Sequence, residues 1–128
     1  MNKIKNETLI VWTIAIALFI GAIIHWLIIF NLIEEKNPPF IKWIFDSLAV
    51  FNIIASIGLI LKKSWGRKLA IIIFISQFPT HGYMFYLEHY KNWISGFSTT
   101  NRMIDLILCS VFLLALNKTS VKTIYQKL

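Results

Sequence analysis

The stretch that decides the fold is residues 9–33, LIVWTIAIALFIGAIIHWLIIFNLI, which holds no Asp, Glu, Lys or Arg. A helix rises about 1.5 Å per residue, so this stretch is longer than the roughly 30 Å core of a bilayer and can cross it with some tilt. The short basic segment before it resembles the start of a signal peptide, but the apolar stretch is long and lacks a small-residue cleavage site. It therefore predicts a retained membrane span.

Further apolar segments follow, at about residues 40–61, 69–87 and 102–117. EEKNPP at 34–39 ends the first segment because proline cannot continue a helix. A Ser or Thr at 98–100 can cap the start of the last one. The basic tail 118–128 is expected to fray into a cytoplasmic helix. This pattern predicts an all-α integral membrane four-helix bundle in a single domain.

The composition favours the bilayer over water as the solvent of this chain. Of its 128 residues, 57% are hydrophobic and 15% charged, whereas a soluble domain carries roughly 45–50% and about 25%. The net charge of +7 is concentrated at the ends of the apolar segments, which membrane orientation explains better than nucleic-acid binding does. The single cysteine, Cys109, excludes an internal disulfide and paired-cysteine redox chemistry.

The distribution of Lys and Arg predicts the topology. Nine of them lie in the N-terminal segment, the turn 62–68 and the tail, and four lie in or beside the other two loops. The positive-inside rule therefore places both termini in the cytoplasm, in an inner or plasma membrane, which requires an even number of spans. Aromatic residues agree with this orientation: Trp12 and Trp65 fall near the inner interface, and Trp43, Tyr86, Tyr90 and Trp93 near the outer one.

Each predicted span has one face of small or polar residues, and such faces bring helices together in lipid. The faces are Thr13, Ala17, Gly21 and His25; Asp46, Ala49, Asn52 and Ser56; Gln77 and His81; and Arg102, Asp105 and Cys109. Counting along the helices puts the ionisable members at similar depths in the outer half of the bilayer. Because burying such groups is costly, they are functional candidates. We expect an outward-facing polar pocket lined by His25, Asp46, Asn52, Gln77, His81 and Asp105.

Other interpretations of these residues stay open. The faces can be ordinary packing seams, and Asp46 and Asp105 can lie solvated among the lipid head groups. Arg102 can form an ion pair with either aspartate, and His25 can bond to a backbone carbonyl. Two His and two Asp can also hold a transition metal, but no His-x-x-x-His or Cys-x-x-Cys spacing supports this. We predict no metal and no cofactor.

The segment FPTHGY at 78–83 predicts a break in the third span. Pro79 cannot donate a hydrogen bond to the carbonyl of Ile75, and its ring clashes with the preceding turn. Gly82 would allow close packing beyond the kink. Because broken helices expose backbone groups that must line protein or water, Pro79 and Gly82 are a candidate hinge near His81. Alternatively, the kink only shapes the bundle.

Two surface segments carry weaker functional signals. Lys62, Lys63, Arg67 and Lys68 can bind anionic lipid head groups, or they can serve only to set the topology. Residues 90–97 can form a short amphipathic cover over the pocket.

The hydropathy plan and the basic turn KKSWGRK at 62–68 resemble the small four-span inner-membrane proteins of bacteria, including the DoxX-like group. The resemblance implies the same four-helix plan and carries no site residues. The first span lacks the glutamate of small multidrug exporters. The chain also has none of the Ser-x-x-Lys, His-Glu-x-x-His and Gly-x-Ser-x-Gly motifs.

Two non-enzymatic functions are favoured by these sequence patterns, and a membrane-embedded enzyme comes third because no nucleophile–base pair can be argued. In the first, the pocket binds or passes a small solute, proton or ion, with His25 and His81 as titrating groups because histidine changes charge near neutral pH. In the second, the chain is an accessory or interaction protein, such as a subunit, an immunity-like protein or a stress protein. Its expected partners are the lipid bilayer and a second copy or another membrane protein, and not nucleic acid.

Overall fold

The computed structural model describes residues 2–32, 39–91 and 99–126, and side chains within 5–24, 26, 43, 46–86, 89–90 and 102–126. These residues form helices and no strands, which confirms the predicted all-α class. The helices are α1 (Asn2–Leu32), α2 (Pro39–Ile60), α3 (Ser64–Lys91), α4 (Thr99–Asn117) and α5 (Thr119–Gln126).

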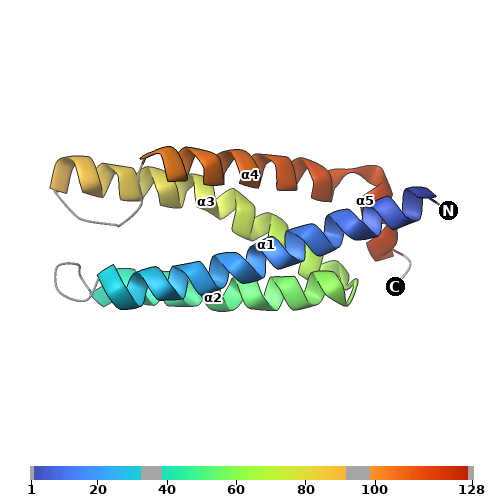
Figure 1. Cartoon of the computed structure of the whole chain (residues 1–128), viewed down its shortest axis with the longest axis horizontal. Helices are drawn as coiled ribbons and strands as arrows, with labels where there is room; N and C mark the ends of the chain where they lie inside the picture. Colours follow the sequence, from blue (N-terminus) through green and yellow to red (C-terminus); the bar gives the residue numbers. More distant parts are fainter. Residues whose placement is uncertain (1, 33–38, 92–98, 127–128) are drawn as a thin grey trace.

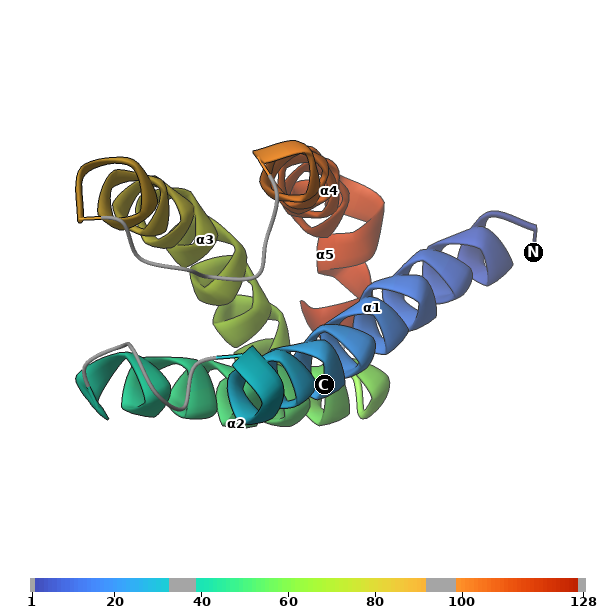
Figure 2. The same cartoon turned by 60° about the vertical axis from the view of Figure 1, so that its left-hand side comes forward.

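The first four helices run up and down along the long axis of the molecule (Figure 1). α1 packs mainly on α2, α3 packs on α2 and α4, and α1 and α4 make few direct contacts. α5 bends away from α4 by 61° and lies between α4 and α1 (Figure 2). The beginning of α1, the turn between α2 and α3, the end of α4 and α5 therefore share one end of the molecule, which we call the α5 end.

The observed helices overlap all the predicted apolar segments but extend beyond them. α1 begins at Asn2, before the first apolar residue of the span, and α3 begins at Ser64 and ends at Lys91. α4 begins at Thr99, within the predicted capping segment. Hydropathy locates the part of a helix that suits lipid, whereas the helix itself continues through polar residues whose backbone bonds remain favourable.

The turn between α2 and α3 is closed by two backbone hydrogen bonds. The Lys63 amide donates to the Gly58 carbonyl at 2.9 Å, and the Lys62 amide donates to the Leu59 carbonyl at 3.0 Å. This pair is the Schellman motif, whose first residue beyond the helix is left-handed. Lys62 accordingly has φ 54°. The structure thus turns the chain sharply within the basic segment 62–68.

Gly58 and Gly66 bring the backbones of α2 and α3 into contact beside this turn. A Cβ atom added to Gly58 would lie 2.6 Å from the Gly66 Cα and 2.7 Å from the Trp65 ring. A Cβ atom added to Gly82 would meet nothing within 4 Å. The close packing expected at Gly82 is therefore wrong for the described residues, and the close approach occurs at Gly58 and Gly66 instead.

Pro79 lies inside α3, which remains helical on both sides of it. Two side chains bond carbonyls near the proline: the Ser76 hydroxyl donates to the Ile73 carbonyl and the Thr80 hydroxyl donates to the Ser76 carbonyl, both at 2.7 Å. Figure 1 shows α3 changing direction between its green beginning near α2 and its yellow part beside α4. The change of direction is the one expected where proline removes a helical hydrogen bond.

The largest group of buried apolar side chains joins all five helices. Its members are Val11, Ile14, Ala15, Leu18, Ala55, Leu59, Ala70, Ile73, Phe74, Cys109, Leu116, Val121 and Tyr125. Inside it, the Ser56 hydroxyl donates to the Ala15 carbonyl at 2.8 Å and so fixes α1 against α2. Val121 and Tyr125 anchor α5, so residues 119–126 of the tail form a helix that packs on the other helices, whereas fraying was expected.

Large apolar side chains also cover much of the outside. Trp12, Trp43 and Trp65 are all exposed, together with Leu, Ile, Val and Phe side chains on the outer faces of α1–α4. Among the described residues, only the segment Lys5–Ile24 is by itself long and apolar enough to cross a membrane. Arg102–Asn117 and Thr119–Gln126 pass the same test as a bent pair, and Asp46–Ile60 is a shorter apolar helix.

Candidate functional site

A pocket of about 110 Å³, lined mainly by apolar residues together with Asn52, Gln77 and Asp105, lies between the first four helices. Its lining residues are Ala17, Leu18, Gly21, Asn52, Ile73, Phe74, Gln77, Asp105, Leu108, Cys109 and Phe112. Asn52 of α2 and Gln77 of α3 are 4% and 6% exposed and form its buried side. The more exposed lining residues are Ala17 and Gly21 of α1 and Asp105 and Leu108 of α4. The pocket therefore opens between α1 and α4, the two helices that make few contacts.

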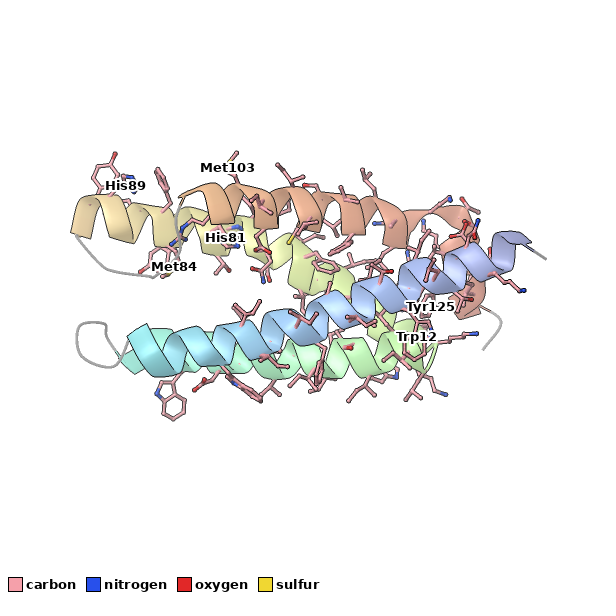
Figure 3. All side chains as sticks on the ribbon, in the orientation of Figure 1. Trp12, His81, Met84, His89, Met103 and Tyr125 are labelled. Carbon is pink, nitrogen blue, oxygen red and sulfur yellow. The ribbon has the colours of Figure 1, made fainter. Side chains whose placement is uncertain are left out.

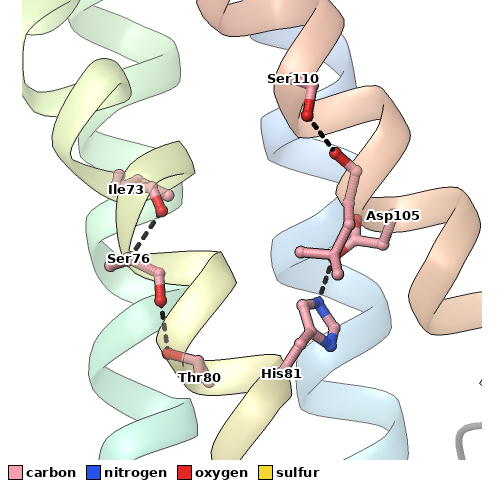
Figure 4. A network of polar contacts seen from close by, with 7 residues as sticks. Ile73, Ser76, Thr80, His81, Asp105 and Ser110 are labelled. Atoms are coloured by element: carbon pink, nitrogen blue, oxygen red, sulfur yellow. Dashed lines mark hydrogen bonds and ion pairs between the residues drawn. The ribbon is translucent and has the colours of Figure 1, made fainter.

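His81 and Asp105 join α3 to α4 beside this pocket. The His81 Nε2 lies 2.5 Å from the Asp105 Oδ2, so an imidazole N–H donates to the carboxylate. The His81 side chain is 12% exposed and that of Asp105 is 45% exposed. Figure 4 shows the histidine directed from α3 toward the aspartate. The structure thus pairs Asp105 with a histidine from another helix, one turn beyond Gln77 on α3.

Asn52 is the most deeply buried polar residue of the pocket. Within the part of the chain that the structure describes, its Oδ1 atom is buried and accepts no hydrogen bond. Gly21 lies beside it, and a Cβ atom there would be in ordinary van der Waals contact with the Asn52 Nδ2 at 3.8 Å. Buried amide oxygens are nearly always paired. The Asn52 Oδ1 is therefore a candidate acceptor for a hydrogen bond from a ligand.

The apolar side of the pocket contains two aromatic rings that the sequence patterns did not single out. Phe74 and Phe112 lie with their ring centroids 5.5 Å apart and their planes tilted by 47°. Phe74 precedes Gln77 by one turn, and Phe112 lies two turns after Asp105, so helical spacing from the polar residues could have found both. Cys109 completes this side and is 3% exposed.

The six predicted pocket residues are therefore only partly brought together. Asn52, Gln77 and Asp105 line the pocket, and His81 reaches it through Asp105. Asp46 is half-buried and is not among the lining residues. The side chain of His25 lies outside the described part of the chain, as does most of the predicted cover at 90–97.

At the α5 end, the basic residues of the 62–68 turn differ in their surroundings: Arg67 bonds to the end of α4, whereas the three lysines are exposed. Arg67 donates from Nε to the Leu116 carbonyl at 2.8 Å and from a terminal nitrogen to the Asn117 Oδ1 at 3.3 Å. It thereby satisfies carbonyl groups at the end of α4. Lys62, Lys63 and Lys68 are exposed and remain the candidates for lipid head groups.

Lys118 and α5 connect the end of α4 to α1 and α2 at the same end of the molecule. The Lys118 Nζ lies 3.2 Å from the Glu7 Oε1, and Glu7 is 4% exposed. The Tyr125 hydroxyl donates to the Leu59 carbonyl at 3.3 Å. Burial raises the pKa of Tyr125 to about 12, although the nearby Arg67 acts in the opposite direction. Figure 3 shows Tyr125 and Trp12 near this end, far from His81 and Met84.

Fold and pocket together define a small all-helical protein with a mainly apolar pocket among its helices that contains three polar side chains. Residues 8–117 match DUF6163, a family of unknown function, and the chain belongs to that family. No curated protein and no solved structure matches the chain significantly. The DoxX-like resemblance is not tested by these comparisons and stays a prediction.

Proposed function

We propose that this chain is a four-span protein of an inner or plasma membrane, with both termini in the cytoplasm, whose polar pocket binds or passes a small polar solute. The observation that carries this proposal is the meeting of Asn52, Gln77, His81 and Asp105, which come from three helices, at one pocket. Groups so costly to bury in a membrane are usually retained for a function.

The membrane part of the proposal is supported by the surface of the molecule. Soluble monomers rarely expose large continuous apolar patches, whereas here the outer faces of α1–α4 are covered by apolar side chains. The exposed lysines of the 62–68 turn lie at the same end as the beginning of α1 and α5. Positive residues at one end agree with an N-in, C-in topology.

Cysteine accessibility tests the topology. In a Cys109→Ala background, Lys63→Cys and Tyr90→Cys place single thiols on exposed positions near opposite ends of α3. We expect an impermeant maleimide to label Tyr90→Cys in intact spheroplasts and to label Lys63→Cys only in inside-out vesicles. Labelling of both variants from the same side would contradict the four-span topology.

The native Cys109 tests the pocket, because it is the free thiol among the lining residues. We expect a small hydrophilic methanethiosulfonate to reach it from the outer side, since the pocket continues from Cys109, near the middle of α4, to Asp105 in the half of α4 nearer Thr99. Gly21→Leu should block the reaction by filling the pocket. Gly82→Leu, at a position with open space around it, is the matched control and should leave the reaction unchanged.

A reaction at Cys109 that is equally fast in Gly21→Leu and in the wild type would argue against a solute-accessible pocket. The polar residues would then serve helix packing, as in the alternative of an accessory or interaction protein.

A further inference from the structure

The charge of the pocket favours a positively charged ligand. Asp105 is the only acidic residue among the described lining residues, and neither Lys nor Arg is among them. The His81 imidazole N–H donates to one carboxylate oxygen of Asp105, and a carboxylate can accept further hydrogen bonds from a ligand. The aspartate attracts a cation, although water weakens this attraction because the Asp105 side chain is 45% exposed.

The hydrogen-bonding groups favour a ligand that donates from nitrogen. The Asn52 Oδ1 is a buried acceptor that is unpaired among the described residues, and it lines the same pocket as Asp105. A buried acceptor without a donor is costly. An ammonium group carries several N–H donors and can therefore satisfy the amide oxygen and the carboxylate together.

The walls favour an organic cation over a metal ion. Phe74 and Phe112 both line the pocket, and aromatic ring faces attract ammonium groups. A hard metal ion requires about six or more oxygen ligands. Within the described residues, however, no three His, Cys, Asp or Glu side chains come together as a metal site.

The size of the pocket limits the length of the ligand. A volume of 110 Å³ admits a few non-hydrogen atoms, given that a water molecule occupies about 30 Å³ of liquid. Leu18, Ile73 and Leu108 provide the apolar surface that a short alkyl chain would contact.

We infer that the pocket binds a small primary ammonium ion, held by Asp105 and the Asn52 Oδ1 with its alkyl part against Phe74 and Phe112. This inference rests on the proposed solute-binding function and names the class of solute.

Ligand-observed NMR on the full chain in detergent micelles tests the inference. Ethylammonium chloride is the probe, and n-propanol and propionate are the neutral and anionic analogues, all at one ionic strength. We expect saturation transfer to ethylammonium that exceeds transfer to either analogue and that excess methylammonium abolishes. Equal transfer to propanol and ethylammonium would overturn the ammonium assignment.

Two isosteric variants sharpen the test. Asp105→Asn should weaken ethylammonium binding by about tenfold or more, because a charge-assisted hydrogen bond is lost. Asp46→Asn removes a carboxylate outside the pocket and should bind like the wild type. Unchanged affinity in Asp105→Asn would overturn the inference. If Asp105→Asn does not fold, the relative saturation transfer to the three ligands on the wild-type chain still tests whether the pocket prefers an ammonium ion.

The outcomes separate this inference from the proposed function. Propanol binding that Gly21→Leu abolishes, without preference for ethylammonium, would leave a solute pocket but not an ammonium site. Binding of none of the three ligands, together with a reaction at Cys109 that Gly21→Leu does not slow, would count against both.

Discussion

Replacing Gly66 with alanine perturbs the closest contact between α2 and α3. A Cβ atom there would lie 2.5 Å from the Gly58 Cα and 2.8 Å from the Gly58 carbonyl oxygen. Carbon atoms pack best at about 3.5–4.0 Å, so the two backbones would have to separate by about 1 Å. No side-chain rotation can relieve this overlap, because the obstructing atoms are backbone atoms held by the closed turn.

The size of the effect follows from two opposing terms. Overpacking a well-packed contact typically costs about 1–3 kcal/mol, and a backbone obstruction places this contact near the upper limit. Alanine in place of a helical glycine returns about 1 kcal/mol. We therefore expect Gly66→Ala to lower the free energy of unfolding by about 2 kcal/mol.

Gly82→Ala is the matched control, because its added Cβ meets nothing within 4 Å. It should raise the free energy of unfolding by up to about 1 kcal/mol through helix propensity alone. SDS titration in mixed micelles, followed by the helical circular dichroism signal, measures both variants. A Gly66→Ala protein at least as stable as the Gly82→Ala protein would refute the close contact of α2 with α3.

Three further predictions concern the α5 end. Lys62→Gly should stabilise the protein by about 1 kcal/mol, because the left-handed φ of 54° is unfavourable for a residue with a Cβ; the same SDS titration would show it, and a loss of stability would contradict the turn geometry. Arg67→Ala should destabilise by about 1.5 kcal/mol, because the Leu116 carbonyl loses its charged donor, and Arg67→Lys should recover only part of this loss. Because the pKa of Tyr125 in the folded protein is raised to about 12, its stabilising contribution should be complete below about pH 10 and should fall as the pH rises to about 12. Unfolding titrations across this range should therefore show a steeper alkaline loss for the wild type than for Tyr125→Phe, and parallel curves would show that the phenol is not buried.

The helices could be predicted from the sequence because long apolar segments separated by basic or proline-containing turns specify them strongly. Their ends could not. Asn2 and Lys91 lie in polar stretches, where hydropathy no longer distinguishes helix from loop. The anchoring of α5 was also missed, although the apolar residues of this segment, Val121, Ile124 and Tyr125, have the i, i+3, i+4 spacing of an amphipathic helix.

The polar half of the pocket was predictable, because Asn52, Gln77 and Asp105 each stand out within an apolar helix. What the sequence could not provide was the rotation of each helix about its own axis. That rotation leaves Asp46 outside the pocket lining although it precedes Asn52 by only six residues. It also turns Phe74 and Phe112 toward the pocket, where an apolar residue gives no compositional signal.

The contact between Lys118 and Glu7 joins residues that are 111 positions apart. Both α1 and α5 must leave the ribosome before it can form, and contacts between such distant segments form late in folding. During biogenesis the first four helices therefore exist for a time with Glu7 uncovered and with the Leu59 carbonyl lacking the Tyr125 hydroxyl. A premature stop within 118–126 would yield a chain that retains α1–α4 but lacks the contacts through which α5 joins α1 and α2.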